Sequence, residues 1–228
     1  MYTREQVARL IDHAVLQPDS TDREVRQAAD MCRRRGVGCL CVRPTDVALA
    51  ARELAGAECK VASVVGFPHG ANRPEVKALE AALAVEEGAR ELDMVMNIGR
   101  FLSGDLQHVK RDIESVVEVG RPNKVLVKVI LETPCLTLEQ VAAACRIASA
   151  AGADFVKTAT GFAGGGATTE AVDVMLRTVG GAMGVKAAGG IRTWEAAVAF
   201  LEQGCRRLGI GQTEAVLDGA AAGKDAAY

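Results

Sequence analysis

Short apolar runs alternate along the chain with longer alanine-rich stretches in which apolar residues recur every three or four positions. The short runs are typical of buried parallel strands, and the longer stretches are typical of helices that pack one face on a sheet. Two such stretches, Glu75–Glu87 and Leu138–Ala150, predict helices with an apolar face, the first through Val76, Leu79 and Leu83. We expect left-handed caps at the glycines that end helices, namely Gly36, Gly56, Gly88, Gly120, Gly152 and Gly204.

The apolar runs predict eight strands, at Leu10–His13, Gly38–Val42, Lys60–Val65, Glu91–Met96, Val125–Leu131, Asp154–Lys157, Gly184–Ala187 and Arg207–Ile210. Eight strand-helix units without a Gly-x-Gly-x-x-Gly opening favour a closed barrel over an open Rossmann sheet. The sequence therefore predicts an α/β fold, a single-domain TIM (β/α)8 barrel over residues 1–228, with a short C-terminal tail that ends in Tyr228.

The overall charge and composition exclude several classes of partner. The formal net charge is -2, which gives no basic field for nucleic acid or an anionic membrane surface. No apolar run reaches the roughly 20 residues of a membrane span. The seven cysteines follow no signal peptide and, like the three histidines, show no metal-ligand spacing, so we predict reduced thiols and no metal site. We expect a cytoplasmic protein that acts on small molecules.

Two lysines occupy unusual positions near the ends of apolar runs. Lys157 ends the predicted sixth strand, Lys186 lies in the seventh, and a glycine-rich stretch follows each of them. Burial or a neighbouring cation disfavours the protonated form of an amine. A neutral amine attacks carbonyl groups, so two lysines on neighbouring strands predict one Schiff-base nucleophile and one cation that tunes it.

Other polar residues lie at or near the strand ends where barrel enzymes place their chemistry, and they are Asp12, Asp93, Lys128 and Glu132. Period-two alternation puts Lys128 and Glu132 on the same side of their strand, and we expect that side to be the barrel interior. Lysines beside Asp12, Asp93 and Glu132 would suit an acid/base relay. Two alternatives stay open: a structural ion network, above all for Lys128, and a turn-capping role for Asp12.

Glycine-rich segments follow the sixth, seventh and eighth predicted strands. In a TIM barrel the last two of these loops commonly hold a phosphate on backbone N–H groups near a helix N-terminus. The alternative is that the glycines only allow tight turns. In the first interpretation, the residues that bind substrate or phosphate are Gly161, Gly189, Gly190, Arg192, Gly209, Gly211 and Gln212.

These segments resemble the 2-deoxyribose-5-phosphate aldolases, the class I Schiff-base aldolases of deoxyribonucleoside catabolism. The resemblance covers essentially the whole chain and is carried by Ile11–His13, Cys41–Pro44, Val64–Gly70, Glu91–Val95, Val127–Thr133, Phe155–Phe162, Val185–Arg192 and the terminal Tyr228. It implies a TIM barrel that needs no metal or organic cofactor. The implied reaction is the reversible cleavage of 2-deoxy-D-ribose 5-phosphate to acetaldehyde and D-glyceraldehyde 3-phosphate. Members of the family are often homodimers or homotetramers.

The resemblance also implies roles for individual residues. Lys157 matches the Schiff-base lysine, and Lys186 matches the second lysine, whose charge keeps the first one unprotonated. Asp93 matches the carboxylate that relays protons through water, and Asp12 belongs to the same expected catalytic site. Tyr228 matches a C-terminal tyrosine that assists proton transfer at the enamine carbon.

The chain departs from the family pattern at three positions. Ala14 stands where the family usually has threonine, so one hydroxyl near the catalytic water is absent. Gly211 and Gln212 stand where the family usually has a serine that contributes to phosphate binding. The chemistry is therefore better defined than the substrate. The alternatives are an aldolase of the same mechanism with a different or unphosphorylated acceptor, and a non-catalytic barrel that binds sugar phosphates.

Overall fold

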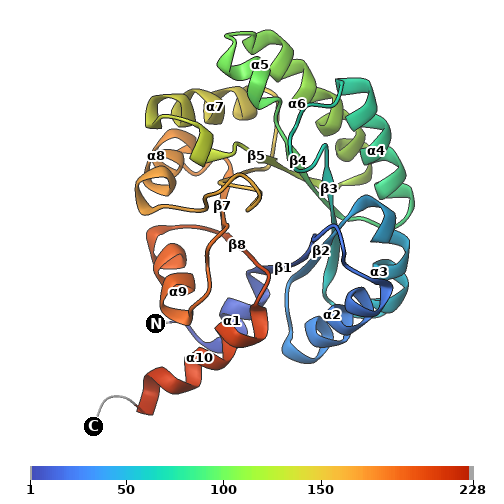
Figure 1. Cartoon of the computed structure of the whole chain (residues 1–228), viewed down its shortest axis with the longest axis vertical. Helices are drawn as coiled ribbons and strands as arrows, with labels where there is room; N and C mark the ends of the chain where they lie inside the picture. The colour runs from blue at the N-terminus through green and yellow to red at the C-terminus, as the bar shows by residue number, and fades with distance from the viewer. Residues whose placement is uncertain (1, 226–228) are drawn as a thin grey trace.

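The computed structural model describes residues 2–225, and these residues form a closed barrel of eight parallel strands (Figure 1). The strands follow one another around the barrel in chain order, and β8 pairs with β1 to close it. Their bounds are β1 Ile11–Val15, β2 Cys39–Val42, β3 Lys60–Val65, β4 Glu91–Val95, β5 Leu126–Ile130, β6 Phe155–Lys157, β7 Gly184–Ala188 and β8 Arg207–Ile210. The predicted α/β class and the TIM-barrel topology are confirmed.

Helices form an outer ring around the strands (Figure 1). Their bounds are α1 Arg4–Arg9, α2 Asp22–Arg35, α3 Val47–Glu53, α4 Pro74–Glu86, α5 Ile98–Leu102, α6 Leu106–Gly120, α7 Leu138–Ala150, α8 Thr169–Val179, α9 Trp194–Gln203 and α10 Thr213–Asp225. Three short 3-10 turns complete the set: η1 Pro44–Asp46, η2 Arg121–Asn123 and η3 Thr133–Cys135. Threonines cap several helix starts, and Thr3, Thr21 and Thr137 do so with full capping boxes.

The predicted elements agree with the structure apart from small shifts at their ends. β3, β8 and α7 have the predicted bounds, and α4 begins and ends one residue earlier than predicted. The largest shift is in β1, which runs on to Val15 because this residue pairs with Val42 of β2. Pairing with a neighbouring strand is a tertiary constraint, so the local pattern does not reveal where β1 ends.

Five of the predicted glycines, Gly36, Gly56, Gly88, Gly152 and Gly204, have positive φ angles from 66° to 121°, and Gly36 is confirmed as a left-handed helix cap. The prediction for Gly120 is wrong, because it lies inside α6 with φ -70° and the chain continues through η2. The left-handed turn comes later, at Lys124 with φ 55°. A Cβ on Gly120 would lie 2.9 Å from the carbonyl oxygen of Val125, so this glycine allows α6 to approach the start of β5.

Helix α4 turns its large apolar side chains toward solvent. Val76, Leu79 and Leu83 are 48%, 61% and 51% exposed, so the face that they form is not the packed face that the pattern predicts. The buried positions of α4, which packs on β3 and α6, are instead occupied by Lys77, Ala81 and Ala84. Small side chains bring α4 close to its neighbours, and no apolar stripe in the sequence marks such a face.

Lys77 and Asp112 form a fully buried ion pair that fixes the end of β4. Lys77 Nζ lies 2.6 Å from Asp112 Oδ2 and donates a 2.8 Å hydrogen bond to the carbonyl oxygen of Val95. The backbone N–H of Asn97 donates to the same Asp112 oxygen at 3.2 Å. The pair therefore ties α4 and α6 to the strand that carries Asp93.

The barrel interior has an apolar part and a charged part. Small side chains from β2 and β3, namely Cys39, Cys41, Ala62 and Val64, form a compact cluster on one side. Charged side chains from the other strands meet in the rest of the interior. The larger hydrophobic core lies between the strands and the helix ring. A cluster of buried charges therefore lies at the centre of the barrel, where the candidate site lies.

The loop between β6 and α8 is held against the loop that follows β7. A Cβ on Gly166 would lie 2.3 Å from the carbonyl oxygen of Gly189, so the two backbones touch directly. Ala167 N donates a 3.1 Å hydrogen bond to that same oxygen. Glycine is needed at both contact positions because a side chain would separate the loops. The contact places the β6–α8 loop beside the mouth of the barrel.

Candidate active site

Charged side chains from six strands meet inside the barrel. The cations are Lys128, Lys157, Lys186 and Arg207, and the carboxylates are Asp12, Glu91 and Asp93. The register explains the grouping, because Lys157 lies opposite Lys186 and Asp93 lies opposite Lys128 on neighbouring strands. A parallel barrel thus brings residues that are far apart in sequence into one buried ion cluster. The two lysines predicted to be neighbours occupy adjacent strands.

Asp93 contacts all three lysines. Its Oδ1 accepts a hydrogen bond from Lys128 Nζ at 2.7 Å. Its Oδ2 accepts from Lys157 Nζ at 2.8 Å and from Lys186 Nζ at 2.6 Å. Two amines that share one oxygen stand close together, which is the arrangement that a nucleophile and a neighbouring cation require. The same contact gives the Lys157 amine a direct partner for proton transfer.

Glu91 and Arg207 belong to the cluster, although neither was predicted as a site residue. Arg207 Nε donates to Asp12 Oδ1 at 2.7 Å, and its Nη2 donates to Glu91 Oε2 at 2.6 Å. Lys128 Nζ lies 2.6 Å from the same Glu91 oxygen. One signal was present in the sequence, because the alternation that turns Asp93 inward also turns Glu91 inward.

Ion pairing outweighs burial for most members of the cluster. Burial alone would raise the pKa of Asp93, but its lysine partners, Lys128 foremost, hold that pKa well below its usual range. Burial alone would also raise the pKa of Asp12, which the neighbouring cations lower. Burial acts in the opposite direction on Lys186, and its carboxylate partners hold its pKa above the ordinary lysine value. Asp12 and Asp93 are therefore carboxylates near pH 7, and Lys186 is an ammonium.

The three lysines differ in the number of carboxylates that they contact. Lys128 contacts three carboxylates, Lys186 contacts two, and Lys157 contacts Asp93 alone. The many partners of Lys128 favour the structural interpretation for this residue. Lys157 has the fewest compensating charges, and it ends its strand at the C-terminal face of the barrel, where barrel enzymes place their chemistry.

A cavity of about 450 Å³ opens beside Lys157. It is lined by every residue predicted to bind substrate or phosphate: Gly161, Gly189, Gly190, Arg192, Gly209, Gly211 and Gln212. Ala14, where the family usually has threonine, lines the same cavity. Phe162 also lines it and packs edge-on against Phe67, with ring centroids 5.2 Å apart. The structure therefore places the predicted nucleophile and the predicted binding residues around one cavity.

Two helices begin at this cavity. α9 starts at Trp194, shortly after Arg192, and α10 starts immediately after Gln212. The free N–H groups and the dipole at a helix N-terminus favour an anion. Gly189 and Gly190 have φ angles of 90° and 78°, so both lie in turns that favour glycine. Their role in phosphate binding stays a prediction.

Glu132 does not share an ion pair with the lysines, so its predicted place in the cluster is wrong. It follows β5 in a left-handed conformation with φ 58°, which breaks the alternation of the strand. Its carboxylate accepts hydrogen bonds from the Thr160 hydroxyl at 2.6 Å and from the Thr160 N–H at 3.1 Å. Glu132 therefore holds the start of the loop that lines the cavity.

The family model for DeoC/LacD family aldolases matches residues 6–226 of the chain. The chain belongs to this aldolase family. It is 48% identical over 213 residues to the deoxyribose-phosphate aldolase of Listeria monocytogenes serovar 1/2a, and this alignment covers 93% of this chain and 95% of that protein. It is 50% identical over 216 residues to the deoxyribose-phosphate aldolase of Thermococcus gammatolerans, and this alignment covers 94% of this chain and 96% of that protein.

A solved structure gives the same fold. It is described as a unique tetrameric structure of deoxyribose phosphate aldolase from Aeropyrum pernix, and it is 32% identical to this chain with a TM-score of 0.89. The match covers 95% of this aldolase and 91% of that chain.

Of the predicted catalytic residues, Tyr228 lies outside the described residues, whereas Asp12, Asp93, Lys157 and Lys186 come together.

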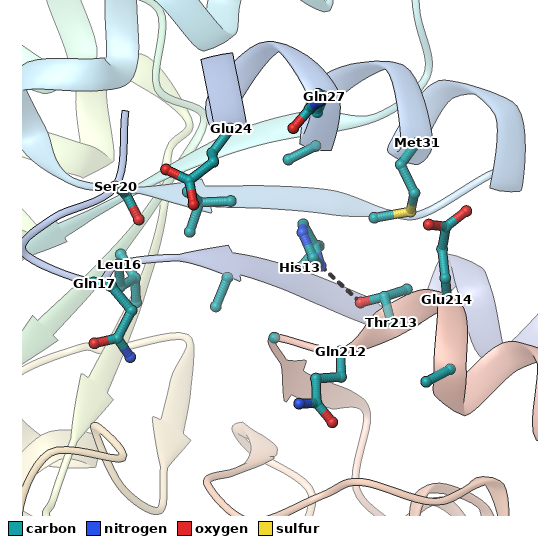
Figure 2. Close-up of a pocket in the computed structure, with 15 residues that line it drawn as sticks. His13, Leu16, Gln17, Ser20, Glu24, Gln27, Met31, Gln212, Thr213 and Glu214 are labelled. Atoms are coloured by element: carbon teal, nitrogen blue, oxygen red, sulfur yellow. Dashed lines mark hydrogen bonds between the residues drawn. The ribbon is translucent and has the colours of Figure 1, made fainter. Parts of the chain in front are cut away.

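A second cavity of about 400 Å³ lies between α2 and the start of α10 (Figure 2). It shares part of its lining with the first cavity, namely Ala14, Leu16, Gln17, Gly211 and Gln212. His13 faces this cavity, and its Nδ1 lies 2.9 Å from the Thr213 hydroxyl. Burial lowers the pKa of His13 to about 4, so the ring is neutral near pH 7. His13 therefore joins β1 to α10 as an uncharged hydrogen-bonding partner.

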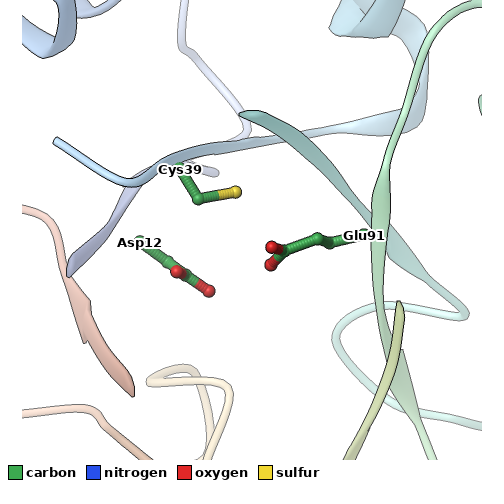
Figure 3. A group of neighbouring side chains, drawn as sticks. All are labelled: Asp12, Cys39 and Glu91. Carbon is green, nitrogen blue, oxygen red and sulfur yellow. The ribbon is translucent and has the colours of Figure 1, made fainter. Parts of the chain in front are cut away.

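In the described part of the aldolase, one group of side chains has donor atoms close enough to share a metal ion: Asp12, Cys39 and Glu91, within 4.8 Å of one another (Figure 3). Both carboxylates already form ion pairs with Arg207 and Lys128. A divalent cation would stand next to these two cations and be repelled. We therefore assign the group to the ion cluster.

No helix within residues 2–225 combines the length and the apolar composition that crossing a bilayer requires.

Proposed function

We propose that this aldolase reversibly cleaves 2-deoxy-D-ribose 5-phosphate to acetaldehyde and D-glyceraldehyde 3-phosphate through a Schiff base on Lys157. One observation carries the proposal: Lys157 is the member of the buried ion cluster that lines the cavity, and all the predicted phosphate-binding residues line it too. The substrate is supported by the two relatives described above, which are deoxyribose-phosphate aldolases at 48% and 50% identity.

The reaction begins when the neutral amine of Lys157 attacks the aldehyde carbon, C1, of the open-chain sugar. Loss of water gives an iminium, which withdraws electrons from the bond between C2 and C3. When the C3 hydroxyl loses its proton, that bond breaks and D-glyceraldehyde 3-phosphate leaves. The enamine that remains is protonated at C2, and water then releases acetaldehyde and restores the amine.

Asp93 is the group that moves protons at the amine in this proposal. Its Oδ2 lies 2.8 Å from Lys157 Nζ, so it takes the proton that the amine must lose before attack and passes it on to water, remaining a carboxylate itself. The neighbouring ammonium of Lys186, 2.6 Å from the same oxygen, disfavours a second positive charge on Lys157. Asp12 contacts Lys186 and Arg207 and holds these cations in place. We assign protonation of the enamine carbon to Tyr228, on the basis of the family resemblance alone.

The sugar phosphate lies with C1 at Lys157 and its phosphate at the other end of the cavity. Arg192 and the N-termini of α9 and α10 supply positive charge there, and Gly189 and Gly190 let the backbone approach the ligand. We place the protein in the cytoplasm, where its seven free cysteines stay reduced.

We also propose that this aldolase forms homo-oligomers through α4. Val76, Leu79 and Leu83 lie on one face of that helix and are each about half exposed, between 48% and 61%. A stripe of large apolar residues at helical spacing is favourable only when another surface covers it. The solved relative from Aeropyrum pernix is described as a tetramer, which favours a second copy of this chain as the covering surface.

The nucleophile is tested first. Lys157→Ala should abolish cleavage of 2-deoxy-D-ribose 5-phosphate, and Lys157→Arg should do no better because a guanidinium stays protonated and cannot attack. In the wild type, borohydride and acetaldehyde should leave a reduced adduct on Lys157 that mass spectrometry can map. An adduct on Lys186 would refute the assignment, and the absence of any adduct would favour a non-catalytic binding barrel.

Proton transfer is tested with two variants. Asp93→Asn keeps the shape of the side chain but removes the base, so turnover should fall by roughly 10²- to 10⁴-fold. Tyr228→Phe should slow the exchange of acetaldehyde methyl protons with deuterated water more than it slows the trapping of the imine. NMR measures the exchange, and mass spectrometry measures the trapping. If Tyr228→Phe changes both rates equally, or neither, Tyr228 has no role at the enamine carbon.

Phosphate recognition is tested at Gly211. A Cβ there meets no atom closer than 3.8 Å, so serine fits without strain. Gly211→Ser should add one hydrogen bond to the phosphate, worth about 1.5 to 3 kcal/mol at best, and lower KM by roughly tenfold to hundredfold. KM for unphosphorylated deoxyribose should not change, because that sugar has no phosphate to accept the new hydrogen bond. If Gly211→Ser leaves both KM values unchanged and the wild type prefers the unphosphorylated sugar, the acceptor is not a phosphate ester.

The oligomer is tested on α4. Leu79→Glu should convert the assembly to monomers in light-scattering measurements, because a carboxylate cannot be buried there without a partner. Leu138→Glu is the matched control, since Leu138 lies on α7 and is 47% exposed. A wild type that is monomeric at micromolar concentration, or a Leu79→Glu variant of unchanged mass, would contradict the assignment of α4.

A further inference from the structure

The ion cluster carries an excess of positive charge. Its four cations and three carboxylates leave one net charge inside the barrel when every group is ionised. A buried excess charge is unfavourable, and the cluster removes it when one of its amines releases a proton. Arg207 cannot release one near neutral pH, because a guanidinium stays protonated.

The contacts select which amine becomes neutral. Burial lowers the pKa of Lys128 and of Lys186, but their carboxylate partners outweigh burial and hold both above the ordinary lysine value. Lys157 has a single carboxylate partner, Asp93. Lys157 is therefore the amine of the cluster whose positive charge has the least compensation.

Glu91 and Arg207 control that net charge from the far end of the barrel. They are the first residues of β4 and β8, and the cavity lies at the opposite ends of the strands. Figure 3 shows the carboxylates of Glu91 and Asp12 reaching toward each other across the interior. Arg207 Nη2 lies 2.6 Å from both carboxylates, and Lys128 Nζ lies 2.6 Å from Glu91 Oε2.

Stability alone is a weak explanation for this pair. Replacing buried ion pairs with apolar side chains of similar size is often neutral or stabilising. The pairing is also incomplete, because Glu91 Oε1 is buried and has no hydrogen-bond partner among the described residues. A buried acceptor left without a partner costs stability and calls for another explanation.

We propose that Glu91 and Arg207 are positioning residues that set the net charge of the cluster and thereby the pH at which Lys157 becomes a free amine. The inference rests on the proposed function, because it takes Lys157 as the nucleophile. Arg207 supplies the cation that makes positive charge exceed negative charge, and Glu91 limits the excess. Neither residue lines the substrate cavity. Arg207 acts through Asp12, which it contacts, and Glu91 acts through Lys128, which it contacts.

The other strands add no competing charge among the described residues. The charged side chains that face Lys157 come from β1, β4, β5, β7 and β8 and are Asp12, Glu91, Asp93, Lys128, Lys186 and Arg207. β2 presents Cys39 and Cys41, and burial raises the pKa of both thiols, to about 11 for Cys41, so they stay neutral. β3 presents Ala62 and Val64. Two further charged side chains come from loops: Arg192 lines the same cavity as Lys157, and Glu132 accepts a hydrogen bond from Thr160.

The test uses opposite changes of charge in the full-length protein. Arg207→Met removes the excess cation, which makes the protonated form of Lys157 more favourable. In the pH profile of kcat/KM for 2-deoxy-D-ribose 5-phosphate, the acidic limb should therefore move up by about one pH unit. Glu91→Gln has the same shape but raises the excess to two, so the limb should move down by about one unit. The double variant restores an excess of one, so its limb should return close to that of the wild type. Arg207→Lys keeps the charge and should leave the limb in place.

A purely structural pair gives a different result. Its single variants would lose rate or stability without opposite shifts of the limb, and the double variant would show no restoration. Either outcome overturns the inference, as does an unshifted limb in Glu91→Gln, which stands as the test if Arg207→Met does not fold. Trapping with cyanoborohydride and acetaldehyde separates the two proposals. No wild-type adduct on Lys157 refutes the proposed function, whereas a wild-type adduct with unshifted limbs refutes only the role of Glu91 and Arg207.

Discussion

One carboxylate, held between three amines at the centre of the barrel, is the interaction on which the candidate site depends. Asp93 is fully buried and contacts Lys128, Lys157 and Lys186 at 2.6 to 2.8 Å. None of these groups is stable alone in an apolar interior, so each needs the others. The rest of the structure holds these groups in position, because the closed barrel aligns the strands and the buried Lys77–Asp112 pair fixes the end of β4.

The fold and most of the candidate site could be predicted from the sequence. Strands buried on both faces give continuous apolar runs, so their number and order are visible in the chain, and lysines inside such runs stand out. The environment of each charge is not visible, because partners come from distant strands. Glu132 shows the limit most clearly, since one left-handed residue after β5 turns its side chain from the lysines to Thr160. Arg207 shows the converse, because an arginine at the start of a strand resembles a solvent-exposed residue until β8 closes on β1.

The two ends of the cavity are built by different means. Side chains in a rigid ion cluster form the end that carries Lys157, and their positions follow from strand register. Loop backbone and helix N-termini form the other end, around Gly189, Gly190 and Gln212. Register tolerates little change, whereas loops accept substitution. The departures from the family pattern at 211 and 212 lie at the tolerant end, which is where families of enzymes change substrate while they keep their chemistry.

The contact between Gly166 and Gly189 divides the loop after β6 into two parts with unequal freedom to change. A side chain at 165 or 166 would collide with Pro134 or with the backbone of Gly189, whereas Gly161 and Gly164 have open space at the Cβ position. An engineer who wishes to widen the range of acceptor aldehydes therefore has a short window, 161–164, for insertion, provided that Gly161 and Gly164 are kept, because their φ angles of 86° and 76° would strain any other residue. Changes beyond it would detach the loop from the barrel before they altered its selectivity.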